Sequence, residues 1–437
     1  MKKKYFFRIL LIALVLVSGF ALLPVEAAAE GTNCTGSHTG WTQLTATTTT
    51  LSSGRYYLAN NLTTNGTDIS VTGDVTLCLN GKKISLNDTF DCISVSGDGY
   101  LTLCDCVGTG EIKKADTGSN VRAGIYLSNN GSMTMYGGKI VSESYYAISC
   151  STTGDLYIRG GTINTRSDSI DVSKINDLTV SSGTITSSEG SGISVDEYGG
   201  AQVRNITISG GNIEGKTGGL LFREFSCTGK VLISGGTLNG KGPVPNATTY
   251  ASHYYGLSFM NSNGGACNVT ISGGKLDGAR GGIYTNDSLV DITVSGGTVG
   301  NSKAVGIEAN GGDFRIDGGR IYTMRYGGPV NTVMTNGELY GVGGMEGSFR
   351  MYGGTLGRVG SQTDTSAITV GSSSPPKENP ISIEIHGGTV VGSKYAIEGY
   401  GVYKLKISGG TWSGGTADLY LNVYDGKTIT RVNDIYR

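Results

Sequence analysis

The sequence predicts an all-β fold, a single right-handed parallel β-helix solenoid of about thirteen three-strand coils with capped ends. Three observations lead to this fold. A Gly-Gly or Ser-Gly pair, followed by a small or polar residue and then an apolar one, recurs with a shortest spacing of 22 residues. Between these pairs apolar and polar residues alternate, which is the period of a β-strand and not of a helix. The 73 glycines among 437 residues show no Gly-x-y period, which excludes collagen, and the regular apolar residues between them argue against disorder.

One repeat is clearest in residues 177–195, which read DLTVS, TITS and GISV with Gly or Ser between the segments. Each segment alternates apolar and polar residues, so each is expected to form a short strand with one buried face. The chain turns sharply at the glycine pair after the first strand, where a positive φ or a missing Cβ is useful. The residues expected to face the core in this repeat are Leu178, Val180, Ile185, Ile193 and Val195.

The first 29 residues have the pattern of an export signal. Lys2 to Lys4 and Arg8 precede an apolar stretch from Ile9 to Leu23, and Ala27 to Ala29 supply the small residues of a cleavage site. We expect a mature chain from Glu30 that is secreted or associated with the cell surface; an uncleaved membrane anchor is the alternative. No second stretch is apolar enough to span a bilayer, so no transmembrane segment is expected in the mature chain.

Loss of the signal changes the formal net charge from −1 to −4, because four cationic residues and one anionic residue are removed. Such a charge is not that of a nucleic-acid-binding protein. Residues 30–62 are expected to cap the N-terminal end, residues 63–415 to form the β-helix, and residues 416–437, which depart from the repeat, to cap the other end. Since capped ends oppose end-to-end stacking, we expect a monomer.

Four segments near the N-terminus carry a resemblance to a known group of proteins. SGRYYLANNL, VTLCLNGKKI, LTLCDCVGTGEI and MTMYGGKI resemble the start of adhesin-like, often carbohydrate-binding, β-helix proteins exported by Gram-positive bacteria. The repeat from roughly Leu58 to Trp412 resembles the architecture of the pectate-lyase-like superfamily. The resemblance implies an extracellular protein whose partners are glycans, such as host or cell-surface polysaccharide.

The eight cysteines fit an exported protein, and disulfides or buried thiols are expected in preference to a metal site. Cys78 and Cys104 occupy equivalent positions in adjacent coils and are expected to point outward side by side, which suits a disulfide between them. A second disulfide would start at Cys34. Cys227 and Cys267 flank the coil with a long insertion and are the second candidate pair, although the sequence does not decide the pairing. Cys150 is expected to be a core thiol.

A metal site is not expected from the sequence. The C-x-C motif of residues 104–106 lacks the second ligand pair that structural zinc spacing needs. His38, His253 and His386 are far apart in the sequence, which argues against a histidine-based site.

The third strands of successive coils present a cluster of charged residues on the outside. The candidate catalytic residues there are Asp171, Asp196, Glu197, Arg223 and Glu224. The long insertion that follows brings candidate binding residues that we expect to lean over the same face, namely Tyr250, His253, Tyr254 and Tyr255. Carboxylates, an arginine and aromatic rings beside a groove suit sugar binding or cleavage; ordinary solvated corners are the alternative.

A second outward patch follows the first strands of later coils. Its candidate binding residues are Arg315, Arg350 and His386, which share their columns with Asp317, Tyr352, Glu384 and Lys406. Such a patch suits a sugar, but a salt-bridged surface is the simpler interpretation because exposed ion pairs are common and weak.

Three functions are consistent with these features. The first is a secreted or cell-surface adhesin-like protein that binds glycans and has no cofactor. The second is a polysaccharide lyase or glycoside hydrolase acting in the groove of the third strands, with Ca²⁺ as a cofactor if it is a lyase. The third is a structural spacer. The sequence lacks a polygalacturonase-like set of N-T-D, D-D and G-H-G motifs, which favours binding over catalysis.

Overall fold

The computed structural model describes the chain from Cys34 to Asn433, and every element in that part of the chain is a β-strand, bridge or turn. The gaps within this range are residues 35, 65, 87–89, 116–121, 144, 244–252, 263–265, 345, 358–365, 372–380, 402–403 and 425–428. The predicted export signal, the candidate Tyr250 and the side chain of Glu197 lie outside what is described.

The strands form three parallel stacks, to which the chain contributes in turn as it passes through successive coils. The first stack contains β1 (Thr42–Leu44), β3 (Gly54–Leu58), β6 (Asp74–Cys78), β9 (Tyr100–Cys104), β12 (Ser132–Met135), β22 (Cys267–Ile271), β25 (Val290–Val294), β28 (Asp313–Ile316), β31 (Asn331–Met334), β34 (Ser348–Met351), β37 (Ser382–Ile385) and β40 (Lys404–Ile407).

The second stack contains β4 (Leu62–Thr64), β7 (Lys83–Leu86), β10 (Glu111–Lys114), β13 (Lys139–Ser142), β18 (Asn212–Gly215), β20 (Thr237–Gly240), β23 (Lys275–Gly278), β26 (Thr298–Val299), β29 (Arg320–Ile321), β32 (Glu338–Leu339), β35 (Thr355–Gly357), β38 (Thr389–Gly392) and β41 (Thr411–Gly414). The third stack contains β2 (Thr50–Leu51), β5 (Ile69–Val71), β8 (Ile93–Val95), β11 (Ala123–Asn129), β14 (Tyr146–Thr152), β21 (Tyr255–Ser262), β24 (Gly281–Thr285), β27 (Val305–Ala309), β30 (Met324–Tyr326), β33 (Val342–Gly344), β36 (Ile368–Gly371), β39 (Tyr395–Gly401) and β42 (Ala417–Tyr424).

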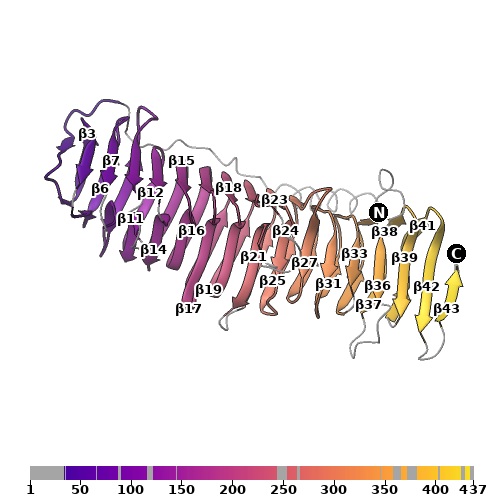
Figure 1. Cartoon of the computed structure of the whole chain (residues 1–437). Coiled ribbons are helices and arrows are strands. Elements are labelled where there is room, and N and C mark those ends of the chain that lie inside the picture. The colour runs from indigo at the N-terminus through magenta and orange to yellow at the C-terminus, as the bar shows by residue number, and fades with distance from the viewer. Residues whose placement is uncertain are drawn as a thin grey trace, which may run out of the picture.

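Four long strands continue around corners and belong to two or three stacks each. They are β15 (Asp155–Thr165), β16 (Ile170–Ser187), β17 (Ser191–Ile208) and β19 (Gly218–Ile233). The chain therefore advances along one axis from the N-terminal to the C-terminal end, as Figure 1 shows. This arrangement is all-β, repeating and consistent with a β-solenoid.

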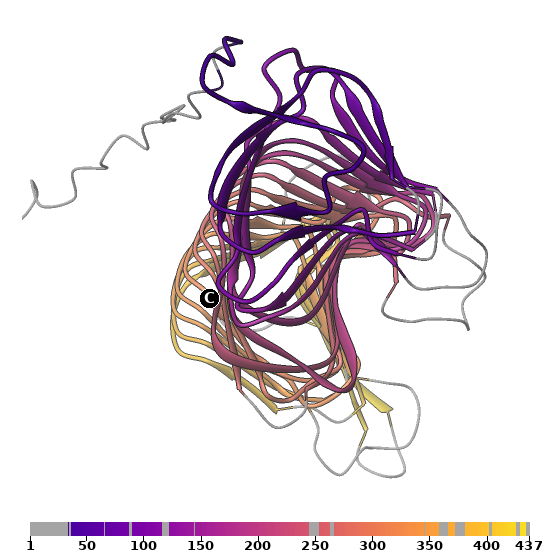
Figure 2. The same cartoon turned by 90° about the vertical axis from the view of Figure 1, so that its left-hand side faces the viewer.

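The register of the parallel pairs places apolar residues on apolar residues. Leu178 pairs with Ile206, and Ile185 pairs with Ile213. The five residues predicted to face the core between positions 177 and 195 are all fully buried, which confirms the alternation read from the sequence. Viewed along the stack from its N-terminal end, successive turns of the chain lie one behind another, each slightly displaced from the one before (Figure 2).

The glycine pair at the corner between the first and second stacks has two separate physical reasons. At Gly387 a Cβ would lie 2.6 Å from the carbonyl oxygen of Tyr352 in the preceding coil, so the first position has no room for a side chain. Gly388 has φ of 88°, a conformation that L-residues with a side chain rarely adopt. The corner conformation predicted for these pairs is thus confirmed.

The C-terminal end departs from parallel stacking. Strand β43 (Ile429–Asn433) pairs with β42 in the antiparallel direction, so it covers the last edge of the third stack. At the other end, β1 pairs with β3 and begins the first stack. Among the described residues there is no helix with the length and apolarity needed to cross a membrane.

Candidate functional site

Asp196 and Arg223 are register partners on β17 and β19 and form the centre of the predicted third-strand cluster. The Arg223 Nε atom lies 2.9 Å from Asp196 Oδ2, and the two side chains are 36% and 34% exposed. Nε is itself buried and has no hydrogen-bond partner. The contact is therefore a close ion pair, and the exposed part of the guanidinium lies next to the Asp196 carboxylate.

Two further aspartates lie on the preceding coil. Asp171 on β16 accepts a hydrogen bond from the Ser149 hydroxyl at 3.3 Å. Asp168, just before β16, accepts the backbone N–H of Ser191 at 2.6 Å. Burial raises the pKa of the Asp168 carboxyl, and burial also raises the pKa of Asp196 although Arg223 opposes that shift.

Tyr146, at the start of β14, completes a row across four neighbouring strands. Its pKa is raised by burial and by the charges of Asp171, Asp168 and Asp196. The neighbouring Tyr145 is 43% exposed. We call the residues Tyr146, Asp168, Asp171, Asp196 and Arg223 the acidic cluster; at about 4.8 Å per strand it extends about 14 Å along the stack.

Asp168 was not among the residues predicted for this cluster. It lies in the sequence SDSID only three residues before Asp171, and it joins the cluster because the chain turns into β16 between the two residues. Glu224, which was predicted, is half-buried and has φ of 45°, at the point where β19 bends after Arg223.

The predicted aromatic residues of the insertion lie differently from expectation. Tyr254 is 7% exposed and Tyr255 is fully buried, so neither ring offers an open surface. The Tyr255 hydroxyl donates to Glu308 Oε2 at 2.6 Å, and its ring lies 5.3 Å from the ring of Tyr284. His253 is half-buried, and its pKa is lowered by burial and by the nearby charges of Arg223 and Arg280. His253 is therefore the member of this group that approaches the acidic cluster.

The second predicted patch, on the later first strands, is assembled by the register. Arg350 pairs with Glu384, and Glu384 pairs with Lys406. The His386 ring stacks on Tyr352 at 4.9 Å, while its nitrogens contact Glu384 at 3.2 Å and Ser408 at 2.8 Å. The hydrogen bond from His386 lowers the pKa of Glu384. The polar groups of this patch satisfy one another, in keeping with a salt-bridged surface.

Arg315 occupies the same outward column two coils before Arg350, as predicted. Its Nε donates to Asp317 Oδ2 at 2.6 Å, and Asp317 also accepts the hydroxyl of Thr335 at 2.6 Å. The Asp317 carboxylate is therefore already satisfied by groups on its own face.

The disulfides predicted at Cys78, Cys104, Cys227 and Cys267 are absent, because every cysteine of the described chain is free. Cys78 and Cys104 are register partners, as predicted, but both are buried under the N-terminal segment and do not point into solvent. Paired positions on adjacent parallel strands hold their Cβ atoms about 4.8 Å apart, beyond the range of about 3.5–4.5 Å that a disulfide needs. Cys150 is a fully buried core thiol, as predicted.

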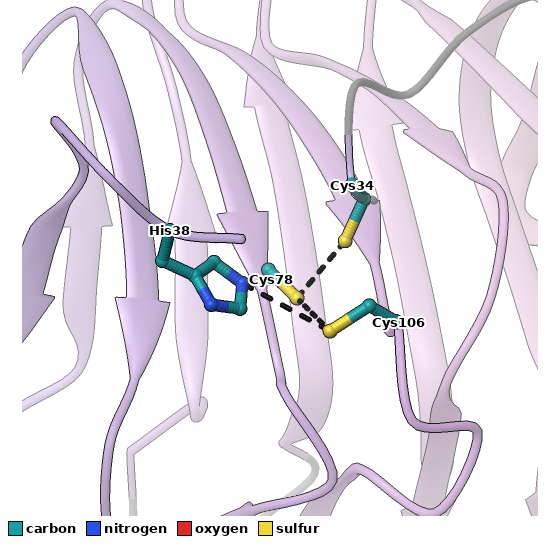
Figure 3. Close-up of side chains that lie close together, drawn as sticks. All are labelled: Cys34, His38, Cys78 and Cys106. Atoms are coloured by element: carbon teal, nitrogen blue, oxygen red, sulfur yellow. Dashed lines mark hydrogen bonds between the residues drawn. The ribbon is translucent and has the colours of Figure 1, made fainter. Parts of the chain in front are cut away.

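A cluster of thiols and one imidazole lies where the N-terminal segment crosses the loops after β6 and β9. Cys34, His38, Cys78 and Cys106 each direct one ligand atom to a common centre, and these atoms all lie within 4.8 Å of one another (Figure 3). The cluster is held by its surroundings, since the His38 ring stacks on Tyr57 at 4.6 Å with an angle of 8° between the planes.

The thiols of this cluster have strongly shifted pKa values. Hydrogen bonds from Cys104, and then from Cys34, lower the pKa of Cys78 to about 4 against the effect of burial. Burial raises the pKa of Cys34 to about 12. The Cys78 sulfur therefore lies among groups that can donate to it or share a cation with it.

Sequence reasoning placed Cys78 beside Cys104 and considered a bond from Cys34, but it did not bring His38 or Cys106 to the same place. The available signal was the alignment of LCLNG with LCDCV, which puts Asn80 and Cys106 at equivalent positions one coil apart. The C-x₃-H spacing of Cys34 and His38 was a second signal.

Comparisons of this chain with protein-family models, with curated proteins and with solved structures found no match. The function therefore has to be inferred from the site itself.

Proposed function

We propose that this chain is an exported, adhesin-like protein that binds glycans on the outside of a right-handed parallel β-helix of about thirteen coils. The three parallel stacks support a pectate-lyase-like architecture. A right-handed helix is expected because nearly all crossover connections between parallel strands are right-handed. The export pattern of residues 1–29 supports secretion or attachment to the cell surface.

The acidic cluster is the proposed binding site, and one observation carries this assignment. The Arg223 side chain is 36% exposed beside Asp196, so a guanidinium donor and several carboxylate acceptors lie together on a partly covered surface. A sugar presents neighbouring hydroxyls that both accept and donate. One hydroxyl can accept from the arginine while donating to an aspartate, and Tyr145 offers an exposed ring at the edge.

The row of strands that carries the cluster favours a linear polymer over a single sugar. Its residues lie on or next to the consecutive strands β14, β16, β17 and β19, so the cluster spans successive coils along the axis of the molecule. An extended glycan lying along that axis would contact the cluster over about 14 Å.

Glycan binding is tested with the mature chain on a panel of neutral and acidic polysaccharides, with and without Ca²⁺. Arg223→Gln removes the charge and the guanidinium donors, and should weaken retention roughly 10- to 150-fold, the range for a hydrogen bond to a charged group. Arg350→Gln, which removes an arginine from an ion pair in the second patch, is the matched control and should leave retention unchanged. Equal retention by both variants and the unmodified chain would refute the assignment.

Catalysis by the same cluster is the second candidate function, and the raised pKa of Asp168 and Asp196 favours it. A carboxyl that stays protonated at higher pH is suited to act as a general acid in glycoside cleavage. The same incubations test for catalysis, because a lyase or hydrolase would create new chain ends in the polysaccharide. Asp196→Asn should then abolish the formation of new chain ends. Intact retained glycan supports binding alone, and neither retention nor new ends would favour a structural spacer.

A further inference from the structure

Four side chains with metal-binding atoms converge at the N-terminal end of the molecule from three separate segments. Cys34 and His38 precede β1, Cys78 ends β6, and Cys106 follows β9 (Figure 3). The acidic cluster proposed to bind glycans involves none of these residues. Three sulfurs and one imidazole nitrogen form a ligand set known from structural zinc sites.

We propose that Cys34, His38, Cys78 and Cys106 bind one zinc ion in a tetrahedral site. Cys34 Sγ lies 3.0 Å from Cys78 Sγ, Cys78 Sγ lies 3.5 Å from Cys106 Sγ, and Cys106 Sγ lies 3.9 Å from His38 Nε2. Zn–S bonds of about 2.3 Å and a Zn–N bond of about 2.0 Å place tetrahedral ligand atoms about 3.5–3.8 Å apart. Movements of about 1 Å or less would therefore complete the site.

The donor set selects the class of metal. Thiolates and an imidazole are soft or borderline ligands, whereas Ca²⁺ and Mg²⁺ require oxygen ligands that this set does not supply. Four protein ligands fill a tetrahedron and leave no position for water or substrate. The site is thus of the structural kind and not of the catalytic kind.

Neighbouring groups hold the ligands in place, as expected for a metal site. Asp105, between the two cysteines of the C-x-C motif, accepts the backbone N–H groups of Gly81 at 2.7 Å and Gly110 at 2.5 Å, which fixes the loops that carry the site. Asn80 Oδ1 lies 3.5 Å from Cys106 Sγ. His38 is packed between the stacked ring of Tyr57 and the edge of Trp41 at 5.2 Å.

The ion would fasten the N-terminal segment across the first coils. Between Cys34 and Trp41 the described residues include no buried apolar side chain, so apolar burial contributes little to holding this segment. Its two ligands, Cys34 and His38, would instead be tied to Cys78 and Cys106 in successive coils. A cross-link of this kind protects the end of a solenoid, where exposed strand edges and core would otherwise be open.

The competing chemistry is oxidation of Cys34 and Cys78 to a disulfide. That reaction joins the two sulfurs, releases two protons and transfers two electrons to an external oxidant. It would remove two of the four ligands, so the disulfide and the zinc site exclude each other. Cys104, the register partner of Cys78, lies outside the proposed ligand set.

The test uses the full mature chain, purified without added metal, reduced with a phosphine, reconstituted with Zn²⁺ alone and then freed of unbound metal. Elemental analysis should give one zinc per chain, and thiol titration with and without a chelator should show three thiols that react only after the metal is removed. Replacement of Zn²⁺ by Co²⁺ should give the intense visible absorption of tetrahedral cobalt together with sulfur-to-cobalt charge transfer, a readout that needs no variant.

Two pairs of variants locate the ligands. Cys106→Ala and His38→Ala should reduce zinc affinity at least 100-fold, whereas Cys150→Ala and His386→Ala, their matched controls, should retain one zinc per chain. Loss of zinc from Cys104→Ala together with its retention by Cys106→Ala would overturn the ligand set. Failure of the reduced, unmodified chain to bind zinc in a stoichiometric amount would overturn the site itself. So would a Cys34–Cys78 disulfide in a metal-free chain isolated without reductant.

Discussion

Substitution of Gly387 by Ala tests whether close packing between coils, rather than backbone flexibility, requires the first glycine of each corner pair. The added Cβ would lie 2.6 Å from the carbonyl oxygen of Tyr352, whereas a carbon and an oxygen in ordinary contact are separated by more than 3 Å. The two coils would have to separate locally by about 0.6–0.8 Å, roughly one seventh of their spacing of about 4.8 Å. Such overpacking destabilises proteins by about 1–3 kcal/mol, and we expect about 2 kcal/mol here.

Gly137 provides a matched control for this substitution. It is the first glycine of the equivalent pair in YGGKI, but its nearest neighbour to an added Cβ is the backbone nitrogen of Asp105 at 3.6 Å, an ordinary contact. Neither Gly137 nor Gly387 has a positive φ, so the two substitutions differ in space and not in backbone conformation. Gly137→Ala should therefore change the free energy of unfolding by less than about 0.5 kcal/mol.

Urea unfolding followed by circular dichroism measures both effects. The midpoint of Gly387→Ala should fall while the slope of the transition stays that of the unmodified chain, which also checks that a long repeat array unfolds as one unit. Equal midpoints for the two alanine variants would refute the packing argument. A lower midpoint for Gly137→Ala than for Gly387→Ala would refute it as well.

Three further substitutions test the core, a buried hydrogen bond and a buried carboxyl. Phe222→Ala empties the centre of a buried group of phenylalanines and should cost about 3–5 kcal/mol in urea unfolding. Tyr255→Phe leaves Glu308 without its 2.6 Å partner and should cost about 1–3 kcal/mol. Burial raises the pKa of the Asp168 carboxyl in the folded chain above its value of 3.8 in the unfolded chain. Between these two pKa values the unfolded chain releases the proton more readily, so the folded state loses stability as the pH rises. Asp168→Asn keeps an acceptor for the Ser191 N–H but cannot ionise. The urea midpoint of this variant, compared with that of the unmodified chain, should therefore be higher at pH 7 than it is below pH 3.8. An equal difference in midpoint at both pH values would contradict this.

The strand repeat predicts which outward side chains of the candidate sites lie next to one another, but not which of the predicted residues are buried. The sequence placed Asp196 next to Arg223, because the repeat aligns their two strands and side chains alternate strictly along a strand. It also placed Arg350 next to Glu384 by the same rule. It did not place Tyr255 in the interior, since that burial depends on contacts with the coils that follow, where its ring meets Tyr284 and its hydroxyl meets Glu308.

The sequence by itself determined the stacks of this protein. Strand alternation has a period of two, so a pattern such as that of residues 177–195 decides which side chains are buried before any long-range contact is known. The glycine pairs likewise marked the corners, because positive φ and close backbone approach are local demands of the chain.

Only the tertiary structure decided what covers the stacks. His38 meets Cys78 and Cys106 because a segment outside the repeat folds across the first coils, and no periodicity specifies where such a segment lies. The buried Arg223 Nε is equally a product of neighbouring coils, not of its own strand. Repeats report contacts between equivalent positions, whereas the cluster of thiols and one imidazole is made from positions that the repeat does not relate.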